Sequence, residues 1–382
     1  TTAGAISVNL PAGTAGDVVA IKDYANTFDT NAVTLVQNGS DKIGGSTVNA
    51  TLSTEGLAVT LVFIDSTQGW LVTDSGLQSE APSPQYVTAT GGTITCSGDY
   101  RIHTFTGPGT FCVSNAGSLA GSTLVDYMVV AGGGAGGDAG DRGSGGGGAG
   151  GYRESPGTAS GSYTVSPLGV APAVALPVSV TGYPITVGAG GAGVACNPQN
   201  AGPGENSVFS TITAYGGGGG GQCDASSPLG KSGAPGGSGG GAGISGPSGG
   251  TIGNGNTPPV SPPQGNPGGS YAGGCSSAGA GGGGGGATAV GANAGPPAGN
   301  GGAGATSSIN GTPTARAGGG GGGGGNNSGT GSAGGGNGGQ YPGPASTAGT
   351  TNTGGGGGGS SDNSGGANGG SGIVIIRYKF QN

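Results

Sequence analysis

Short runs of alternating apolar and polar residues dominate the first part of the chain. They occupy residues 5–10, 17–23, 33–37, 58–64 and 69–73. A period of two places every second side chain on the same face of an extended backbone, which is typical of β-strands. Residues 1–73 are therefore predicted to form a small all-β domain. Because a core of this size stabilises a fold only weakly, association between copies of the domain is expected.

A second set of alternating runs lies in residues 85–215, after residues 74–84, which mix Gly, Ser, Pro and acidic residues and are predicted to be a linker. Two of the runs in 85–215, ending near Val130 and Tyr215, continue directly into glycine without a turn sequence. The region is therefore predicted to be rich in β-strands that lead into a glycine-rich domain.

Glycine-rich blocks recur throughout residues 216–382 and alternate with loops that hold most of the Pro, Asn, Thr and Tyr residues of this region. The whole chain of 382 residues has 105 glycines and 24 prolines. Such a composition is typical of disordered or fibrous chains. A flexible linker has no reason to alternate blocks with bounded loops, so the regular alternation favours an ordered repeat.

Polyglycine can be ordered only by contact with other segments, because glycine loses more backbone entropy on ordering than any other residue. In the polyproline-II conformation the backbone has three residues per turn, and its N–H and C=O groups point outward. Glycine has no side chain to separate such helices, so they can pack side by side through backbone hydrogen bonds and Cα–H···O contacts. The predicted fold is all-β plus a polyglycine-II helical sandwich, with essentially no α-helix. A closing strand is expected at the C-terminus.

The charge pattern narrows the classes of partner. Charged residues make up only 7% of the chain and the net charge is −7, so no basic surface for nucleic acid is expected. No apolar run approaches the roughly 20 residues that span a bilayer, so no membrane insertion is expected.

Five cysteines are present. Cys96 and Cys112 flank a potential hairpin, and Cys196 and Cys223 lie in loops beside glycine blocks, so these two pairs are the preferred disulfides if any form. Buried free thiols are the alternative for both pairs. Cys275 is left over.

Catalytic and metal-binding motifs are weak. The single histidine, His103, lies in a predicted strand without nearby metal-ligand spacing, so a structural role is expected. Residues 236–240 match G-x-S-x-G by chance in a Gly- and Ser-rich chain, without the strand-to-helix context of a nucleophile. Asp138 and Asp141 lack the recurring aspartates of calcium-binding repeats. We therefore expect no enzymatic activity, no cofactor and no metal.

Tyr271, Arg316 and Tyr341 are the candidate binding residues. They occur among small residues at or near predicted loop tips, where aromatic and polar side chains can contact a surface ligand. The alternative is that they cap the ends of the glycine-rich domain.

Several motifs together resemble the glycine-rich domain of tail-fibre and adhesin proteins of tailed bacteriophages. They are STLVDYMVVAGGGAGG at 122–137, GSGGGGAGGYRE at 143–154, YPITVGAGGAG at 183–193, TITAYGGGGGG at 211–221 and GGSGIVIIRY at 369–378. The resemblance covers about residues 85–382. It implies a β region leading into packed polyglycine-II helices, with loops at one tip contacting the host surface. Residues 1–73 resemble, less specifically, a small β domain that precedes distal fibre regions and is often trimeric.

The resemblance implies a non-enzymatic receptor-binding fibre protein in the extracellular virion. Its expected partners are a host cell-surface glycan or outer-membrane receptor, other fibre or tail proteins, and two further copies in a homotrimer. An extracellular filament or adhesin subunit of a cell is the first alternative. An ice-binding protein is a weaker one, because no regular rows of threonine repeat along the sequence.

Overall fold

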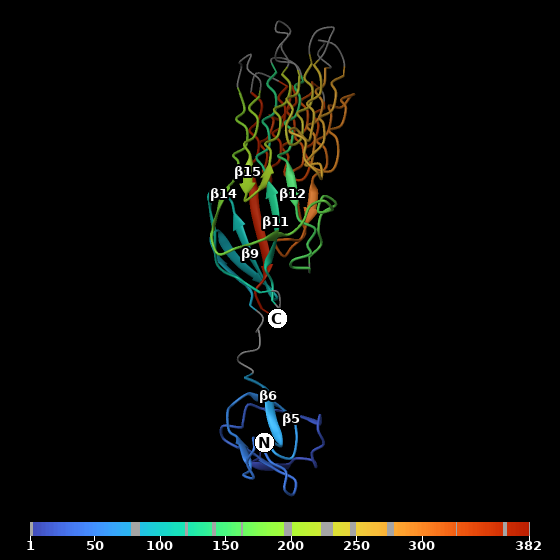
Figure 1. Cartoon of the computed structure of the whole chain (residues 1–382). Helices are drawn as coiled ribbons and strands as arrows, with labels where there is room; N and C mark the ends of the chain where they lie inside the picture. The colour runs from blue at the N-terminus through green and yellow to red at the C-terminus, as the bar shows by residue number, and fades with distance from the viewer. Residues whose placement is uncertain are drawn as a thin grey trace. The chain divides into compact units, whose positions relative to one another are not determined.

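A computed structural model describes residues 3–77, 85–118, 121–139, 143–161, 163–194, 201–222, 232–244, 250–272, 279–325, 327–361 and 365–381. These residues form strands and extended segments without any helix, which confirms the predicted all-β class. The chain divides into two compact units, Thr1–Pro84 and Gln85–Asn382 (Figure 1).

The first unit contains two three-stranded sheets, with strand orders β1-β3-β4 and β2-β5-β6. Its core is apolar and includes Leu35, Leu61 and Trp70, each at most 1% exposed. The strands are β1 (Ile6–Asn9), β2 (Val18–Lys22), β3 (Val33–Val36), β4 (Ala50–Leu52), β5 (Leu57–Phe63) and β6 (Trp70–Leu77).

Strand β6 continues four residues beyond the end predicted for this domain. Asp74, Ser75 and Gly76 pair with Thr60, Val59 and Ala58 of β5, with a register shift between Thr60 and Leu61. These residues lack an apolar pattern because this part of β6 is exposed. Backbone pairing to β5 therefore extends the strand where the side-chain pattern stops.

The second unit contains a five-stranded sheet, in the order β16-β15-β14-β10-β7, and a six-stranded sheet, in the order β12-β11-β19-β9-β8 with β13 paired to β11. A hairpin, β17-β18, forms a further small sheet. The strands are β7 (Val87–Thr90), β8 (Thr93–Ser97), β9 (Tyr100–Phe105), β10 (Gly109–Ala116), β11 (Leu124–Val130), β12 (Tyr152–Glu154), β13 (Leu176–Pro177), β14 (Gly182–Thr186), β15 (Ser207–Phe209), β16 (Ile212–Ala214), β17 (Ala305–Ser307), β18 (Thr314–Arg316) and β19 (Ile373–Lys379).

Both faces of the six-stranded sheet are buried at its centre. One face packs against the five-stranded sheet, where Phe111 contacts Phe209 and Tyr378 at ring-centroid distances of 6.0 and 6.1 Å. The other face packs Met128 and Ile375 against residues of β12, the β17–β18 hairpin and the glycine segments. Strands β11 and β19 are therefore almost entirely buried. In β9, Ile102 and Phe105 point to opposite faces of the sheet, and both are buried.

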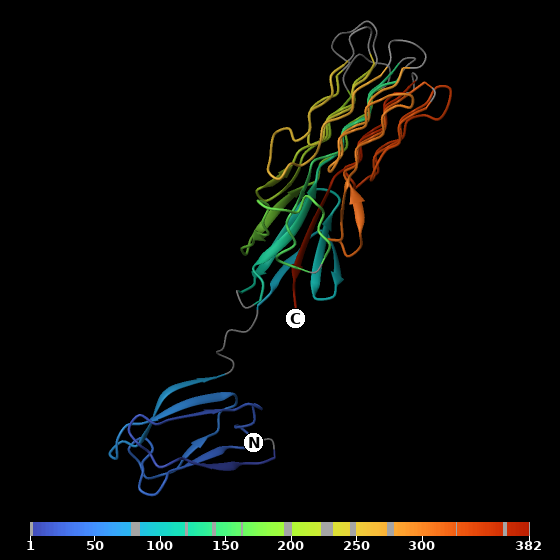
Figure 2. The same ribbon diagram turned by 90° about the vertical axis from the view of Figure 1, so that its right-hand side faces the viewer.

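The glycine segments extend from the ends of these strands (Figures 1 and 2). Residues 131–139 continue β11, residues 143–151 lead into β12, and residues 365–372 lead into β19. We call the end of the segments nearest these strands the sandwich end and the opposite end the distal end.

Residues 143–151 have six neighbouring segments, which reveals hexagonal packing. Successive N–H groups donate to three different neighbours: Gly145 to Gly221, Gly146 to Gly282 and Gly147 to Gly357, at 2.8 to 2.9 Å. The pattern repeats after three residues, with Gly148, Ala149 and Gly150 donating to Gly218, Gly285 and Gly354. Three further neighbours donate to its carbonyl oxygens, from Gly134, Gly241 and Gly320. This threefold repeat is that of polyproline-II geometry, as predicted.

Almost no side chain fits inside this lattice. A Cβ added to Gly147 would lie 2.1 Å from the carbonyl oxygen of Gly134, and one added to Gly321 would lie 2.0 Å from that of Gly329. Ordering a backbone costs about 1–2 kcal/mol per residue, whereas one hydrogen bond contributes a net of about 0.5–1.5 kcal/mol. Hydrogen bonds of this size offset only part of the entropy cost, and the strands of the sandwich, from which the segments continue, fix the ends of the segments.

The regions predicted separately as 85–215 and 216–382 form one compact unit. The earliest glycine segment to return to the sheet, 143–151, lies inside the lattice, and the last strand, β19, lies between β11 and β9 in the sheet. Segments that are distant in sequence therefore lie side by side, both in the sheet and in the lattice.

Candidate functional site

The distal end of the lattice contains a row of four neighbouring segments. Ala272 bridges Ala280, Ala280 bridges Gly324, and Gly324 bridges Gln340. The segment 317–325 starts directly after β18, so Gly324 lies at its far end from the sandwich. The row therefore marks the surface where the segments turn.

Two of the three candidate binding residues border this row. Tyr271 precedes Ala272 and is half-buried, whereas Tyr341 follows Gln340 and is 55% exposed. The structure thus places the two tyrosines beside opposite ends of the row.

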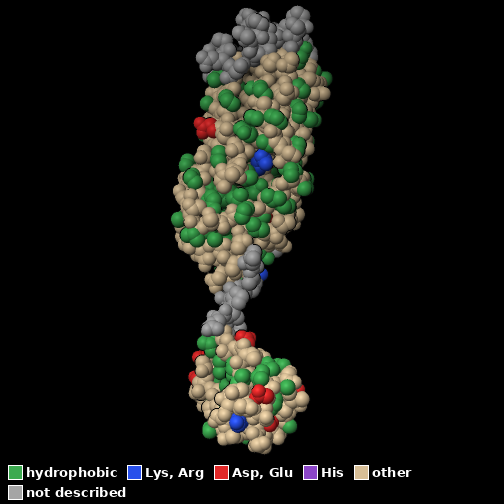
Figure 3. Space-filling view, viewed as in Figure 1, with side chains coloured by type: hydrophobic (Ala, Val, Ile, Leu, Met, Phe, Trp, Pro, Cys, Tyr) green, Lys and Arg blue, Asp and Glu red, His purple; other side chains and the backbone are tan. Residues whose placement is uncertain are grey.

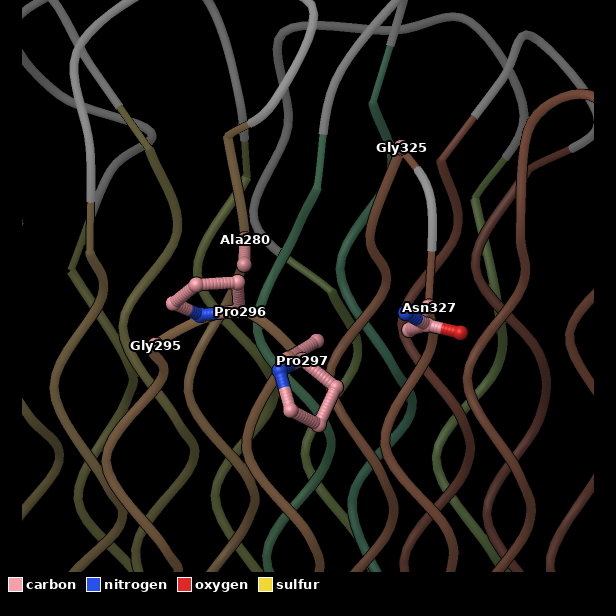
Figure 4. Close-up of a pocket in the computed structure, with 7 residues that line it drawn as sticks. Ala280, Gly295, Pro296, Pro297, Gly325 and Asn327 are labelled. Atoms are coloured by element: carbon pink, nitrogen blue, oxygen red, sulfur yellow. The ribbon is translucent and has the colours of Figure 1, made fainter.

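A small pocket lies beside this row, at Ala280 and Gly325 (Figure 4). Its volume is about 50 Å³. The walls are formed by small and cyclic apolar residues, with one polar side chain, that of Asn327. The lining residues are Ala280, Gly295, Pro296, Pro297, Ala298, Gly325 and Asn327.

Backbone hydrogen bonds fix the walls of this pocket. The N–H of Ala298 donates to the carbonyl oxygen of Asn327 at 3.0 Å, and that of Gly295 donates to Pro297 at 3.0 Å. Pro296, Pro297 and Asn327 are exposed, while Ala280 and Ala298 are buried. None of the predicted site residues lines this pocket; the Pro296–Pro297 pair inside a glycine-poorer loop is the sequence signal that indicates it.

Arg316 does not lie at a loop tip, contrary to the prediction. It ends β18, beside the sandwich, and is 5% exposed. Burial lowers the pKa of its guanidinium, although the nearby Tyr152 and Glu154 oppose this shift. The β17–β18 hairpin holds it there by packing over the six-stranded sheet, a contact that the local sequence does not reveal.

The proline-rich loop 256–264 also lies at the sandwich end. The side chain of Gln264 accepts a hydrogen bond from the backbone N–H of Tyr215 at 2.9 Å, and its carbonyl oxygen accepts one from Tyr152 at 2.9 Å. Gln264 is fully buried. This loop therefore joins the lattice to strands β12 and β16 rather than forming a distal tip.

A cluster of buried polar residues lies on the face of the six-stranded sheet that packs against the β17–β18 hairpin. Its members are Asp126, Glu154, Ser155, Ser160 and Ser307. Asp126 accepts hydrogen bonds from the hydroxyls of Ser155 (2.8 Å) and Ser160 (2.6 Å), and Glu154 accepts one from Ser307 at 2.5 Å. Burial raises the pKa of Glu154, although its hydrogen bonds oppose the shift. The cluster fastens the loop after β12 and the β17–β18 hairpin to the sheet.

His103 is part of the sandwich core. Its Nδ1 lies 2.7 Å from the carbonyl oxygen of Gly91, which can only accept, so Nδ1 carries the proton and donates. Its Nε2 is then the acceptor for the hydroxyl of Tyr378, and these two atoms are 3.0 Å apart. The ring is fully buried, and burial lowers its pKa. These contacts give His103 the structural role that the sequence predicted.

Cys96 and Cys112 are free and exposed, and they do not lie on a common hairpin. Cys96 is in β8 of the six-stranded sheet, whereas Cys112 is in β10 of the other sheet. The predicted pairing is wrong because the chain crosses between the sheets after β9. Cys196, Cys223 and Cys275 lie outside the described residues.

Among the residues that the structure describes, no group of three or more His, Cys, Asp or Glu side chains could hold a metal ion. Asp138 accepts a hydrogen bond from the N–H of Ala139 at 2.8 Å, while Asp141 lies outside the described residues. The described part of the chain also has no helix long and apolar enough to cross a membrane.

The sequence matches the family described as "Glycine-rich domain" over residues 106–379. Because the match covers most of the chain, the protein belongs to this family. A comparison with curated proteins gives no match.

Proposed function

We propose that the protein is a non-enzymatic attachment protein of a tailed-bacteriophage fibre, and that the distal end of its lattice contacts the host cell surface. The observation that carries the proposal is the row of segments at this end, bordered by the exposed Tyr341. A lattice made of backbone provides a rigid support, and functional groups are commonly held on loops over such supports.

The surface chemistry supports a contact with neutral groups. The face of residues 85–382 visible in Figure 3 carries few charged side chains, and the chain as a whole has only 7% charged residues. The proposed partner is therefore a cell-surface glycan or the exposed part of an outer-membrane receptor rather than a polyanion.

The first unit is proposed to join three copies of the chain within the virion, together with other fibre or tail proteins. A pocket of about 440 Å³ lies between the edge strands β1 and β2 and is lined largely by apolar residues. Around it, Ile6 is 48% exposed and Tyr24 is 97% exposed. Exposed apolar side chains beside two unpaired strand edges are suited to contact with another copy.

The molar mass of the full chain in solution tests this assembly. Light scattering is expected to give three times the mass of one chain, and replacing Tyr24 with Ser is expected to shift the mass towards one chain. A mass of one chain for the parent protein would overturn the trimer, and growth into open-ended polymers would favour the alternative of a cellular filament.

Cell attachment tests the function. The fluorescently labelled full chain is incubated with a panel of bacterial strains, and bound fluorescence is measured. Attachment to a subset of strains is expected. Tyr341→Ala should reduce attachment while leaving the melting temperature unchanged, because Tyr341 is exposed.

The matched control is Val174→Ala. Val174 is 67% exposed and lies outside the distal row, just before β13. This variant should attach like the parent. If the parent attaches to no strain, or if Tyr341→Ala and changes at the distal pocket leave attachment intact, recognition through the distal end is rejected.

A further inference from the structure

We propose that the distal pocket lined by Pro296, Pro297 and Asn327 binds the acetamido group of a neutral N-acetylhexosamine. The proposal rests on the attachment function proposed above and names the chemistry of the ligand.

The volume of the pocket fits a small substituent. At about 50 Å³ it exceeds the roughly 30 Å³ that one water molecule occupies in the liquid, but it is too small for a sugar ring. Its walls include the rings of Pro296 and Pro297 and the methyl groups of Ala280 and Ala298. A methyl group fits this volume and can contact the apolar walls, while the polar atoms beside it face Asn327.

The polar rim matches an amide. The exposed side chain of Asn327 belongs to the pocket lining together with Pro297 (Figure 4). An asparagine amide offers both an acceptor oxygen and donor N–H groups. An acetamido group offers the complementary N–H donor and carbonyl acceptor beside its methyl group. The lining contains no charged residue, which favours a neutral ligand over an acidic sugar or a phosphate.

The neighbouring residues allow the rest of a glycan to lie along the row. Adjacent hydrogen-bonded segments are about 4.8 Å apart, so the row from Ala272 to Gln340 spans about 14 Å. Tyr341, next to one end of this row, is 55% exposed, and a tyrosine combines an apolar ring with a hydroxyl, which suit the C–H face and hydroxyl groups of a pyranose.

The pocket is preorganised for binding. The wall that carries the two prolines is joined to the wall that carries Asn327 by the hydrogen bond from the N–H of Ala298 to the carbonyl oxygen of Asn327. Ala280, in a third wall, exchanges two backbone hydrogen bonds with Ala272, of 3.1 and 3.3 Å. A ligand therefore does not have to order these walls, which reduces the cost of binding.

Ligand-observed NMR titration with the full chain tests the proposal. N-acetylglucosamine and N-acetylgalactosamine are the probes, and glucose and galactose, which lack the acetamido group, are the comparison sugars. We expect saturation transfer strongest at the acetyl methyl protons. Affinity for glucose and galactose should be at least ~10-fold weaker, as the loss of two hydrogen bonds and the methyl contact implies.

Two variants and one control locate the site. Asn327→Ala removes the amide, and Gly295→Val adds a side chain at the pocket lining, where an added Cβ meets no atom within 4 Å. Each is expected to weaken binding at least ~10-fold without changing the melting temperature. Gly107→Val is the matched control, because a Cβ at Gly107 also meets no atom within 4 Å and lies outside the pocket.

The outcomes separate this inference from the attachment function. Equal binding of sugars with and without the acetamido group, no binding of either, or full binding by both pocket variants would overturn the pocket assignment. If, in any of those cases, the parent attaches to cells and Tyr341→Ala reduces that attachment, the attachment function stands and only the acetamido subsite is rejected. Attachment to cells that is blocked by an acetylated peptide and not by N-acetylhexosamines would identify a protein ligand and also reject it.

Discussion

The backbone N–H of Gly147 donates a 2.8 Å hydrogen bond to the carbonyl oxygen of Gly357, from a distant part of the chain. The carbonyl oxygen of Gly147 accepts a hydrogen bond from Gly320 at 3.0 Å, so this single residue joins three segments. A core of this kind is made mainly of backbone atoms, and at most of its interior positions a side chain larger than that of Ala or Ser has no room.

Replacing Gly321 with Val is expected to destabilise the second unit by about 3 kcal/mol or more, or to prevent its folding. A Cβ at this position would lie 2.0 Å from the carbonyl oxygen of Gly329, so neighbouring segments would have to separate and lose hydrogen bonds. Thermal unfolding followed by circular dichroism measures the effect.

Gly107→Val is the control for Gly321→Val, since its new Cβ meets no atom within 4 Å. It should unfold within about 0.5 kcal/mol of the parent. Normal melting of Gly321→Val would show that residues 318–325 are not packed in a backbone lattice.

The second unit is expected to lose stability as the pH falls below about 6.5, through His103. Burial lowers the pKa of His103 from 6.5 in the folded state, so the unfolded chain binds the proton more readily and protonation favours unfolding. At a pH below both values, each unit of pKa difference costs about 1.4 kcal/mol. The pH dependence of the melting temperature between pH 7.5 and 5 measures this effect, with His103→Gln as the control that does not titrate. An identical slope in both proteins would exclude His103 as its cause.

Asp23 is expected to stabilise the first unit above about pH 4. Burial by itself raises the pKa of Asp23, but hydrogen bonds of 3.0 Å from the backbone N–H groups of Phe28, Thr27 and Gly56 bring it below the ordinary 3.8. Because the folded pKa is the lower one, this contribution is present above 3.8 and is lost as the pH falls through the folded value.

Asp23→Ala should therefore lower the melting temperature of the first unit at pH 7 and weaken its dependence on acid below pH 4. Asp29→Ala is the control, because Asp29 is exposed on the same unit. Differential scanning calorimetry of both variants between pH 2 and 7 makes the comparison. Equal effects of the two substitutions would contradict the role given to Asp23.

Cys96 and Cys112 are expected to react with iodoacetamide in the folded protein without prior reduction. Both are free and exposed, on strands of different sheets. Replacing either with Ser should change the free energy of unfolding by no more than about 0.5 kcal/mol. Peptide mapping by mass spectrometry measures the labelling, and a Cys96–Cys112 crosslink in the unreduced protein would contradict the separation of these strands.

The amino-acid sequence alone determined the fold class, and it determined that glycine segments joined through their backbones form the core of the glycine-rich domain. Alternating residues such as those of β2 and β5 indicated strands, and the long glycine blocks indicated packed polyproline-II segments, because both signals depend on local chemistry. The alternation of blocks and loops placed Tyr271, Arg316 and Tyr341 in loops, but it did not distinguish the distal end, where the two tyrosines border the row, from the sandwich end, where Arg316 is buried.

Only the tertiary structure decided which segments are neighbours. One glycine block has the same hydrogen-bonding groups as another, so the sequence contains no information that selects Gly357 and Gly320 as the partners of Gly147. The strands that anchor the segments make this choice, and with it they bury Arg316 at the sandwich end, separate Cys96 from Cys112, and bring Pro297 and Asn327 into the lining of one pocket. These contacts join residues distant in sequence, and their geometry arises from the packing of β11, β12 and β19 rather than from any local pattern.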